Sequence, residues 1–385
     1  MVNMKALITA PQNTAVVADI PVPVPGPREI RVKVHSVALN PVDALYVAYP
    51  LDKPGRVVGS DFAGTVDRAG EEVTRWRIGD RVAGFVQGAS SGNWRPGAFA
   101  QFAILEGDLA IKVPSRVSFE EAATLPLCSL TAAQALFIRL EINSPFPSPF
   151  RFDPPKLDTP AILVYSGATS VGLFAISLAK LLHTPAGHPY RIFATVSPRN
   201  REKLLDLGVE AAYDYYSSTW PEDLRRASGG ISYAIDCISE DESTARISQA
   251  FVDGGGKIAV LRQSAWDKQC VREDVLPLYG AVWSGLGHEV FYNTLSIDDV
   301  LPASPSWRQF TIAFYHFLST GAAADASKFP IPANPVRLMP GGLASIVSDG
   351  FALLGSGKVR DRQFTSQGVM MNPISAEKLV YNIDD

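Results

Sequence analysis

The sequence predicts an α/β protein with two domains, a compact barrel-like β domain and a doubly wound nucleotide-binding domain. Two observations predict this fold class. Residues 1 to about 115 carry short apolar strands separated by Gly and Pro turns, which is the pattern of small β barrels. From residue 161, strand-like and helix-like segments alternate, which implies a parallel sheet with helices on both faces.

The composition is that of an ordinary globular protein. The chain has 385 residues, of which 46% are hydrophobic and 19% are charged, so its length suffices for two domains. Its net charge is −4 and no basic block occurs, so we expect no nucleic-acid partner. No continuous apolar run reaches the roughly 18 residues of a membrane span, and no secretory signal is visible at the start, so we expect no membrane contact.

The cysteines indicate the compartment. Cys128, Cys237 and Cys270 lie far apart in the sequence, and no N-x-S/T acceptor is present. This usage is typical of reduced thiols and favours a cytoplasmic protein.

The strands of the β domain are predicted by alternation. In "EIRVKVHSVAL" (29–39), branched apolar residues alternate with Arg31, Lys33 and His35, which is the period of a half-buried strand. The segments "GSDFAGTV" (59–66), "GDRVAGF" (79–85) and "GAFAQFAIL" (97–105) repeat the theme of a Gly turn followed by a short strand.

A helix and a surface excursion follow. In residues 118–140, Ser118 is placed as an N-cap with Glu121 three residues on, which is the signature of a capping box. Residues 143–160 contain too many prolines for a helix or a central strand. We expect this stretch to run over the surface.

The alternating region comprises four predicted strands and three predicted helices. The strands are "AILVY", "YRIFATV", "YAIDCI" and "GGGKIAVL", and the helices are "VGLFAISLAKLL", "NREKLLDLG" and "ESTARISQAF". The tail returns to mixed structure, with a helix over 341–359 that ends in Gly and a closing strand over 377–383.

The turn in "AILVYSGATSVGLFAISLAKLL" (161–182) is a candidate phosphate site. It connects the first strand of the alternating series to the first helix, where amide groups and the helix dipole favour an anion. Gly167 would let the chain turn and a ligand approach, and Gly172 would let the helix pack on the strand. Ala168 is small, and Thr169 and Ser170 add hydroxyls. The spacing is not G-x-G-x-x-G, so the position in the βαβ series carries the prediction.

The end of the next strand bears on the choice of cofactor. NAD sites usually place Asp or Glu there to hold the ribose 2′-hydroxyl. Here the strand ends in Ser197, Pro198, Arg199 and Asn200. A hydroxyl, a guanidinium and an amide suit a 2′-phosphate, which a carboxylate would repel. The sequence therefore predicts NADP(H).

Other sites are not predicted. Three scattered cysteines cannot form a four-ligand structural zinc site. "GSGK" (355–358) fails the P-loop spacing and is interpreted as a helix end. No G-x-S-x-G elbow occurs, and the five histidines form no i, i+4 pair.

The chain resembles the medium-chain dehydrogenase/reductases over nearly its whole length. "VALNPVD" (37–43) followed by "GSDFAGTV" (59–66) is similar to the zinc-free quinone oxidoreductase and enoyl reductase branch. Zinc alcohol dehydrogenases carry Cys where Asn40 stands, and His-Glu where Ser60 and Asp61 stand. The resemblance implies a metal-free site, and we interpret Cys128 as a small buried residue.

Within that branch the resemblance is narrower. "VYSGATS", "ATVSPRN", "YAIDCISEDEST" and "AEKLV" are similar to the trans-acting enoyl reductases that serve fungal highly reducing polyketide synthases. That family uses NADPH to reduce an α,β-unsaturated acyl chain on an acyl carrier protein. The resemblance implies a GroES-like catalytic domain over 1–130, a Rossmann-type NADP-binding domain over 131–312, and a return to the catalytic domain over 313–385.

Site residues carried over by position fall into two groups. The cofactor group contains the turn residues and strand-end residues named above. It also contains Asn40, Pro41, Val42, Asp43, Val171, Tyr215, Leu261, Arg262, Ser375 and Ala376. The acyl-channel group consists of Thr131, Ala132, Ala133, Gln134, Ala135, Leu136, Phe137, Ile138, Gly280, Ala281, Val282, Trp283 and Ser284.

The reaction needs a donor for the charge that builds on the thioester oxygen and a proton for the α-carbon. Tyr46 and Tyr49 follow "NPVD" and are candidate donors, and water is another. Either tyrosine could equally serve only to pack at the cleft. Two other functions remain open at this point. One is a zinc-free reductase of small quinones or enones, and the other is a non-redox cyclase or binding protein on the same fold.

Overall fold

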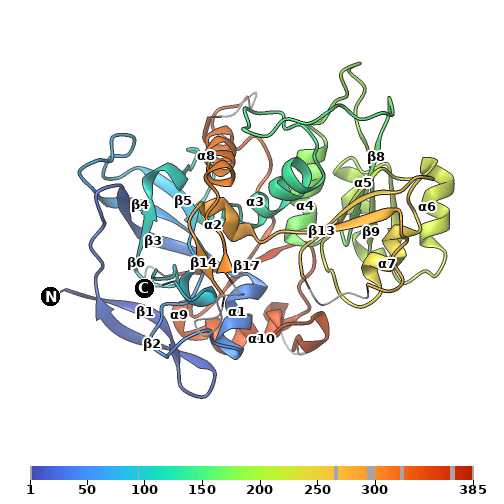
Figure 1. The fold of residues 1–385 in the computed structure, drawn as a ribbon. Helices are drawn as coiled ribbons and strands as arrows, with labels where there is room; N and C mark the ends of the chain where they lie inside the picture. The colour runs from blue at the N-terminus through green and yellow to red at the C-terminus, as the bar shows by residue number, and fades with distance from the viewer. Residues whose placement is uncertain are drawn as a thin grey trace. The chain divides into compact units, whose positions relative to one another are not determined.

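The computed structural model describes residues 2–93, 95–263, 268–292, 300–320, 325–364 and 369–383. The chain divides into two compact units, the first formed by Met1–Leu127 and Trp283–Asp385 and the second by Cys128–Val282. Figure 1 shows the course of the chain, with the first unit built from its blue and red ends and the second from its green and yellow middle.

The second boundary differs from the expected one. Residues 283–312, which the resemblance assigned to the nucleotide-binding domain, are part of the first unit. The ring of Trp283 packs beside Phe85, with centroids 5.8 Å apart, and the Arg308 guanidinium binds Asp108 at 2.7 Å. These contacts join residues about 200 positions apart, so no local pattern in the sequence marks them.

The first unit is built on a seven-stranded sheet. Its strands follow the order β16-β17-β3-β4-β5-β7, and β6 pairs with β3. Only β16 and β17 are parallel, and the other pairs are antiparallel. The strands are β3 (Glu29–Ala38), β4 (Asp61–Ala69), β5 (Arg81–Phe85), β6 (Phe102–Glu106), β7 (Ile111–Lys112), β16 (Val336–Met339) and β17 (Lys378–Asn382).

Two hairpins and several short helices complete this unit. The hairpins are β1 (Asn3–Ala10) with β2 (Thr14–Pro21) and β14 (Val290–Phe291) with β15 (Val300–Leu301). The helices are α1 (Pro41–Ala48), α2 (Phe119–Ala123), α8 (Pro305–Thr320), α9 (Gly342–Ser345), α10 (Ala352–Leu354), the 3₁₀ turns η1 (Gly88–Ser90), η2 (Gly107–Leu109), η5 (Val282–Leu286), η8 (Val359–Asp361) and η9 (Val369–Met371), and the π-helix η7 (Ile346–Phe351).

The predicted period of β3 is present. Ile30, Val32 and Val34 are buried to 1% exposure or less, whereas Lys33 between them is exposed. The alternation places the apolar face of the strand against the core of the first unit.

A buried ion pair joins the N-terminal and C-terminal segments of the first unit. Lys378 Nζ lies 2.5 Å from Asp61 Oδ2, and the two side chains are 2% and 0% exposed. Asp61 opens β4 and Lys378 opens β17, so the pair links segments that are 317 residues apart. The Leu127 amide donates to the other carboxylate oxygen at 2.9 Å. Charges removed from water in this way are tolerated because each has several partners.

The second unit contains a six-stranded sheet. The order β10-β9-β8-β11-β12-β13 is parallel throughout. The strands are β8 (Ala161–Tyr165), β9 (Arg191–Val196), β10 (Ala211–Asp214), β11 (Tyr233–Asp236), β12 (Gly256–Val260) and β13 (Val275–Tyr279). The helices are α3 (Pro126–Gln134), α4 (Ser170–Ala179), α5 (Arg201–Asp206), α6 (Trp220–Ser228), α7 (Ser243–Ser248), the π-helix η3 (Ala135–Arg139) and the 3₁₀ turn η4 (Pro198–Asn200).

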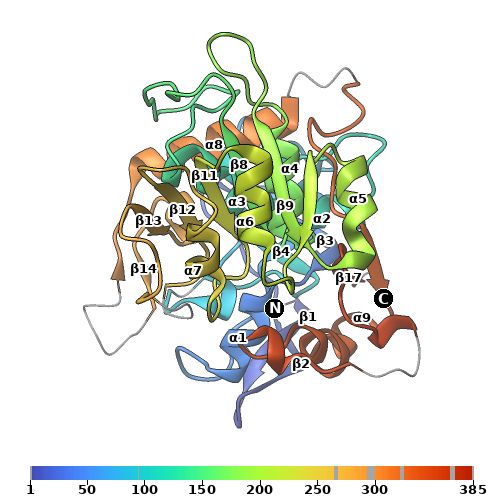
Figure 2. The same cartoon turned by 90° about the vertical axis from the view of Figure 1, so that its right-hand side faces the viewer.

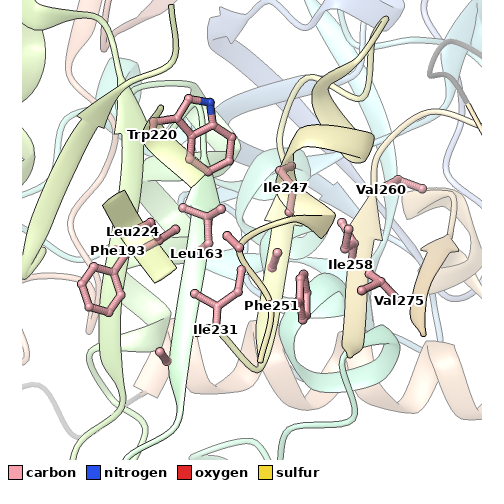
Figure 3. Close-up of a cluster of buried hydrophobic side chains, with 13 residues drawn as sticks. Leu163, Phe193, Trp220, Leu224, Ile231, Ile247, Phe251, Ile258, Val260 and Val275 are labelled. Carbon is pink, nitrogen blue, oxygen red and sulfur yellow. The ribbon is translucent and has the colours of Figure 1, made fainter. Parts of the chain in front are cut away.

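Both faces of this sheet are covered by helices. In Figure 2, α6 and α7 lie in front of the sheet and α4 lies behind it. This is the arrangement that the alternating pattern predicted, although β10, β13 and α6 were not among the predicted elements. Figure 3 shows the core between the sheet and α6 and α7, where Trp220 and Leu224 pack against Leu163 and Phe193.

The helical run from 118 to 140 is divided. Ser118 caps α2 and accepts the Glu121 amide at 3.1 Å, while the Glu121 carboxylate accepts the Ser118 amide, so the predicted capping box is confirmed. Pro126 then begins a second helix, because proline cannot continue the hydrogen-bond ladder of the first. The run Phe119–Arg139 is apolar and long enough to span a membrane, but 83% of its most apolar window is buried inside the protein, as expected of a core helix.

We expect the Asp61–Lys378 pair to be essential for the stability of the first unit. Lys378→Met leaves a buried carboxylate without its cation, which costs about 3–5 kcal/mol of unfolding free energy. Adding Asp61→Asn to that variant should restore part of the loss. Urea unfolding measures both changes.

A surface pair is the control. Lys5 and Asp19 also form an ion pair, 3.0 Å apart, but their side chains are 55% and 59% exposed, so Lys5→Met should cost less than about 1 kcal/mol. Equal losses for Lys378→Met and Lys5→Met would contradict the role of the buried pair.

Candidate active site

The sheet order of the second unit creates a switch point beside β8. β9 lies on one side of β8 and β11 on the other. Ligands of open α/β sheets bind in the crevice outside the carboxyl ends of the strands at such a point. Four predicted cofactor segments follow strands of this sheet and therefore lie along its carboxyl edge: Gly167–Val171, Ser197–Asn200, Tyr215 and Leu261–Arg262.

The turn after β8 has a different geometry from the one that its glycines suggest. The residue with positive φ is Ser166, at 56°. A Cβ on Gly167 would lie 3.0–3.2 Å from the side chains of Leu204, Ala194 and Ile176, so Gly167 is small because β9 and α5 pack against it. The interpretation of Gly167 as the turning residue is corrected accordingly.

The start of α4 is built from small residues. A Cβ on Gly172 would lie 2.7 Å from the Gly167 carbonyl oxygen, so this glycine allows the helix to approach the turn. Thr169 is the N-cap, and its hydroxyl accepts the Gly172 amide at 3.1 Å. The helix that begins here has ten residues, and its dipole favours an anion above the turn.

A hydroxyl, a phenol and a guanidinium lie together after β9 and β10. Burial is the main reason that the pKa of Tyr215 is raised, while the Ser197 side chain and the positive charge of Arg199 act in the opposite direction. Arg199 is exposed, and among the described residues it is in no ion pair. This group carries an unneutralised positive charge at the strand end.

The loops after β11 and β12 are joined by residues that the sequence did not single out. The Leu261 amide donates to the Ser239 hydroxyl at 2.9 Å. The Arg262 guanidinium lies 2.9 Å from the Glu240 carboxylate, which is nearly buried. Arg262 was predicted to face the cofactor, and the structure gives it a carboxylate partner. Ser239 and Glu240 fall inside the motif "YAIDCISEDEST", but only distances in three dimensions distinguish them from its other polar residues.

The acyl-channel residues of the second unit lie on α3, η3 and the chain after β13. The Gln134 amide donates to the Val282 carbonyl at 3.2 Å, and the Arg139 guanidinium donates to the Val260 carbonyl at 2.7 Å. Residues 131–137 are buried and Ile138 is half-buried. The structure therefore brings the predicted segments 131–138 and 280–282 into contact.

In the first unit, Asn40 and Asp43 are parts of one buried polar cluster. Asn40 is the N-cap of α1, and its backbone amide donates to Asp43 Oδ2 at 2.8 Å. The Ser60 hydroxyl donates to Asp43 Oδ1 at 2.6 Å, and the Asn40 side-chain amide donates to Asp61 Oδ2 at 2.9 Å. With Lys378, these residues form what we call the edge cluster: Asn40, Asp43, Ser60, Asp61 and Lys378.

The edge cluster contains two carboxyl groups and one ammonium group. Burial raises the pKa of Asp43 to about 7, and the nearby Asp61 charge adds to the effect, whereas the hydrogen bonds from Ser60 and Asn40 and the charge of Lys378 oppose it. A proton on Asp43 makes the cluster electrically neutral.

The remaining predicted residues of the first unit lie on or after α1, next to β17, or in η5. Tyr49 follows α1 as its C-cap and is 62% exposed, and Tyr46 is half-buried. Ala376 precedes β17 with a φ of 55°, and the amide of Ser375 donates to Glu377 at 3.3 Å. Trp283 and Ser284 are buried in η5.

Asn40, Ser60 and Asp61, which by the resemblance stand where zinc alcohol dehydrogenases carry Cys and His-Glu, are all members of the edge cluster. Within the described ranges, no group of three or more His, Cys, Asp or Glu side chains is placed to hold a metal ion. The Lys378 ammonium already binds the single carboxylate among these three positions.

Comparisons with known proteins identify the fold of both units. Residues 26–115 match the alcohol dehydrogenase GroES-like domain. The crystal structure of the CurK enoyl reductase matches with a TM-score of 0.69 at 18% identity and covers 99% of each chain. An NAD-dependent alcohol dehydrogenase matches with a TM-score of 0.70 at 22% identity, covering 99% of this chain and 100% of the other.

Curated relatives are more similar in sequence. Enoyl reductase cheB of Chaetomium globosum is 32% identical over 98% of this chain and 94% of its own length. Trans-enoyl reductase ACTTS2 of Alternaria alternata is 31% identical over the full length of both chains. The chain thus belongs to the trans-enoyl reductase family of medium-chain dehydrogenase/reductases, oxidoreductases that use a nicotinamide cofactor.

Proposed function

We propose that this chain reduces the α,β-double bond of an enoyl thioester with NADPH, while the acyl chain is attached to the acyl carrier protein of a highly reducing polyketide synthase. The observation that carries the proposal is the full-length similarity to proteins named trans-enoyl reductase. We place the reaction in the cytoplasm.

The residues of the second unit fit NADPH. The N-terminus of α4 at the switch point suits the pyrophosphate, because its amides and dipole favour negative charge. Ser197, Arg199 and Tyr215 suit the 2′-phosphate, because a guanidinium without a carboxylate partner can form charge-assisted hydrogen bonds. The other cofactor contacts, from Asn40–Asp43, Leu261–Arg262 and Ser375–Ala376, remain part of the proposal.

When bound, NADPH supplies the hydride that reduction of the double bond consumes. The protein must supply a hydrogen-bond donor to the thioester oxygen, where negative charge builds, and must allow a proton to reach the α-carbon. Tyr46 is the better placed of the two tyrosine candidates, because Tyr49 is mostly exposed. Water is the alternative proton source.

The acyl chain would lie along α3 and the segment that follows β13. These segments are predominantly small or apolar, and the contact between Gln134 and Val282 holds them together. A channel lined in this way suits a hydrocarbon chain, because its burial is favourable without specific polar contacts.

A direct assay compares three substrates with the purified chain and NADPH. They are an enoyl group on an acyl carrier protein, the same enoyl group on free pantetheine, and a small quinone. Nicotinamide absorbance measures oxidation, and mass spectrometry measures the acyl product. We expect the carrier-bound enoyl group to be reduced with the highest kcat/KM.

The other functions predict different results. Rapid reduction of the quinone without turnover of either enoyl thioester would indicate a reductase of small molecules. A product that forms at the same rate without NADPH would indicate a non-redox protein. Either result would contradict the proposal.

We expect NADPH to bind more tightly than NADH. Arg199→Ala should weaken NADPH binding by roughly tenfold to a hundredfold, because a charge-assisted hydrogen bond contributes about 1.5–3 kcal/mol. Binding of NADH, which has no 2′-phosphate, should not change. Titration of both cofactors against the wild type and the variant measures this.

Arg226→Ala is the matched control, since Arg226 is an exposed arginine of the same unit and its side chain is 79% exposed. It should leave both affinities unchanged. Equal affinities of the wild type for the two cofactors would rule out a 2′-phosphate site.

Asp43 should make stability depend on pH. Its pKa is raised from 3.8 to about 7, so the folded protein holds a proton that the unfolded chain releases between about pH 4 and 7. This contribution is complete below pH 4 and is lost as the pH rises through 7. Asp43→Asn removes it, so the stability of the wild type relative to the variant should fall over this range and stay constant above it.

Urea unfolding at a series of pH values measures that difference. Asp19→Asn, a change at an exposed carboxylate of the same unit, controls for the loss of a surface charge. A difference between the wild type and Asp43→Asn that does not vary with pH would show that Asp43 holds no proton at neutral pH.

A further inference from the structure

The loop that follows β11 lies on one side of the switch point. β11 ends at Asp236, which pairs in register with Tyr165 at the end of β8. The backbone amide of the next residue, Cys237, donates to the Tyr165 carbonyl at 3.3 Å. The loop 237–241 therefore begins beside the end of β8, directly before the turn at which we place the pyrophosphate.

This loop has an unfavourable backbone conformation. Ser239 and Asp241 have φ values of 51° and 49°, in the left-handed region that residues other than glycine rarely adopt. Such a residue costs of order 1 kcal/mol and persists only where its surroundings hold it. Here the Asp236 side chain, the Ser239 hydroxyl and the Arg262–Glu240 pair supply those surroundings.

The Asp236 carboxylate organises the loop. Its Oδ1 accepts the Ile238 and Ser239 amides at 3.0 and 2.7 Å. Its Oδ2 accepts the hydroxyls of Ser243 and Thr244 at 2.6 and 2.9 Å, at the start of α7. Asp236 is fully buried, and four donors within the protein satisfy both of its oxygens. It therefore acts by holding backbone, not by contact with a ligand.

Ser239 extends this arrangement to the neighbouring strand. Its hydroxyl donates to the Asp236 carbonyl at 2.9 Å and accepts the Leu261 amide at 2.9 Å. One hydroxyl thus joins the carboxyl ends of β11 and β12. Arg262, the residue after Leu261, pairs with Glu240 of the same loop, so two adjacent contacts hold these strand ends together.

We propose that Asp236 and Ser239 are positioning residues for the cofactor. They hold loop 237–241 and the end of β12 in the arrangement that accepts the dinucleotide at the switch point. The inference rests on the proposed cofactor site but does not depend on the acyl substrate. Asp236 and Ser239 touch neither the cofactor nor the acyl chain, and they act through the backbone that they fix.

Ser239→Ala tests the inference. Loss of the hydroxyl should raise the Kd for NADPH roughly tenfold, because hydrogen bonds of this kind contribute about 1 kcal/mol or slightly more. The kcat at saturating NADPH should stay within about twofold, since no transition-state contact is removed. Asp236→Asn, which cannot accept on its amide nitrogen, should weaken binding at least as much.

Ser248→Ala is the matched control. The Ser248 hydroxyl is also fully buried and also joins a carbonyl to an amide, those of Ala245 and Arg272, at 2.6 and 3.1 Å. It is the last residue of α7, and its partner Arg272 precedes β13 instead of following a strand at the carboxyl edge. The two alanine variants should have similar Tm values, but only Ser239→Ala should bind NADPH more weakly.

Ser239→Gly separates the hydroxyl from the backbone strain, because glycine adopts positive φ readily. It should bind NADPH as weakly as Ser239→Ala. The inference would be overturned if Ser239→Gly bound like the wild type, if Ser239→Ala kept the wild-type Kd, or if Ser248→Ala lost affinity equally. A wild-type chain that binds no NADPH would instead overturn the proposed function.

Discussion

The buried ion pair between Asp61 and Lys378 is the constraint on which the first unit depends. It connects the first residue of β4 with the first residue of β17, the two strands that flank β3 in the sheet. Two charges out of water are costly unless they are paired and hydrogen-bonded, and here the Leu127 amide, the Asn40 side chain and the Lys378 ammonium all bind Asp61. The same carboxylate therefore fixes Asn40, which begins α1.

The pair also determines the electrostatics of the candidate site. The cation beside the Asp61 carboxylate is the ammonium group of Lys378, which belongs to the protein itself. A divalent ion at this edge would have to displace the Lys378 ammonium from 2.5 Å, against repulsion in a buried environment. With a proton on Asp43, the cluster is already neutral, so it has no need for a further positive charge.

The parts of this account that local patterns encode could be predicted from the sequence. The alternation of β3, the capping box at Ser118 and the βαβ series each depend on residues a few positions apart. The position of the turn at which we propose the pyrophosphate follows from that series. The parts that depend on contacts between distant residues could not be predicted. No local pattern distinguishes Lys378 from an ordinary lysine in a closing strand. Residues 283–312 belong to the first unit because of contacts with the distant residues Phe85 and Asp108. No local pattern marks Ser239 as a link between β11 and β12. The turn after β8 was only partly predictable, because the positive φ falls on Ser166 and not on the glycine beside it.

We propose that an internal ion pair, not a metal, holds the edge cluster of this enoyl reductase. The most direct test is the metal content of the purified enzyme, measured by elemental analysis. The NADPH-dependent turnover of an enoyl thioester is measured on the same preparation before and after chelation. The account predicts full turnover with substoichiometric zinc and no effect of the chelator. One zinc ion per chain, lost together with activity on chelation and restored with it, would contradict the account.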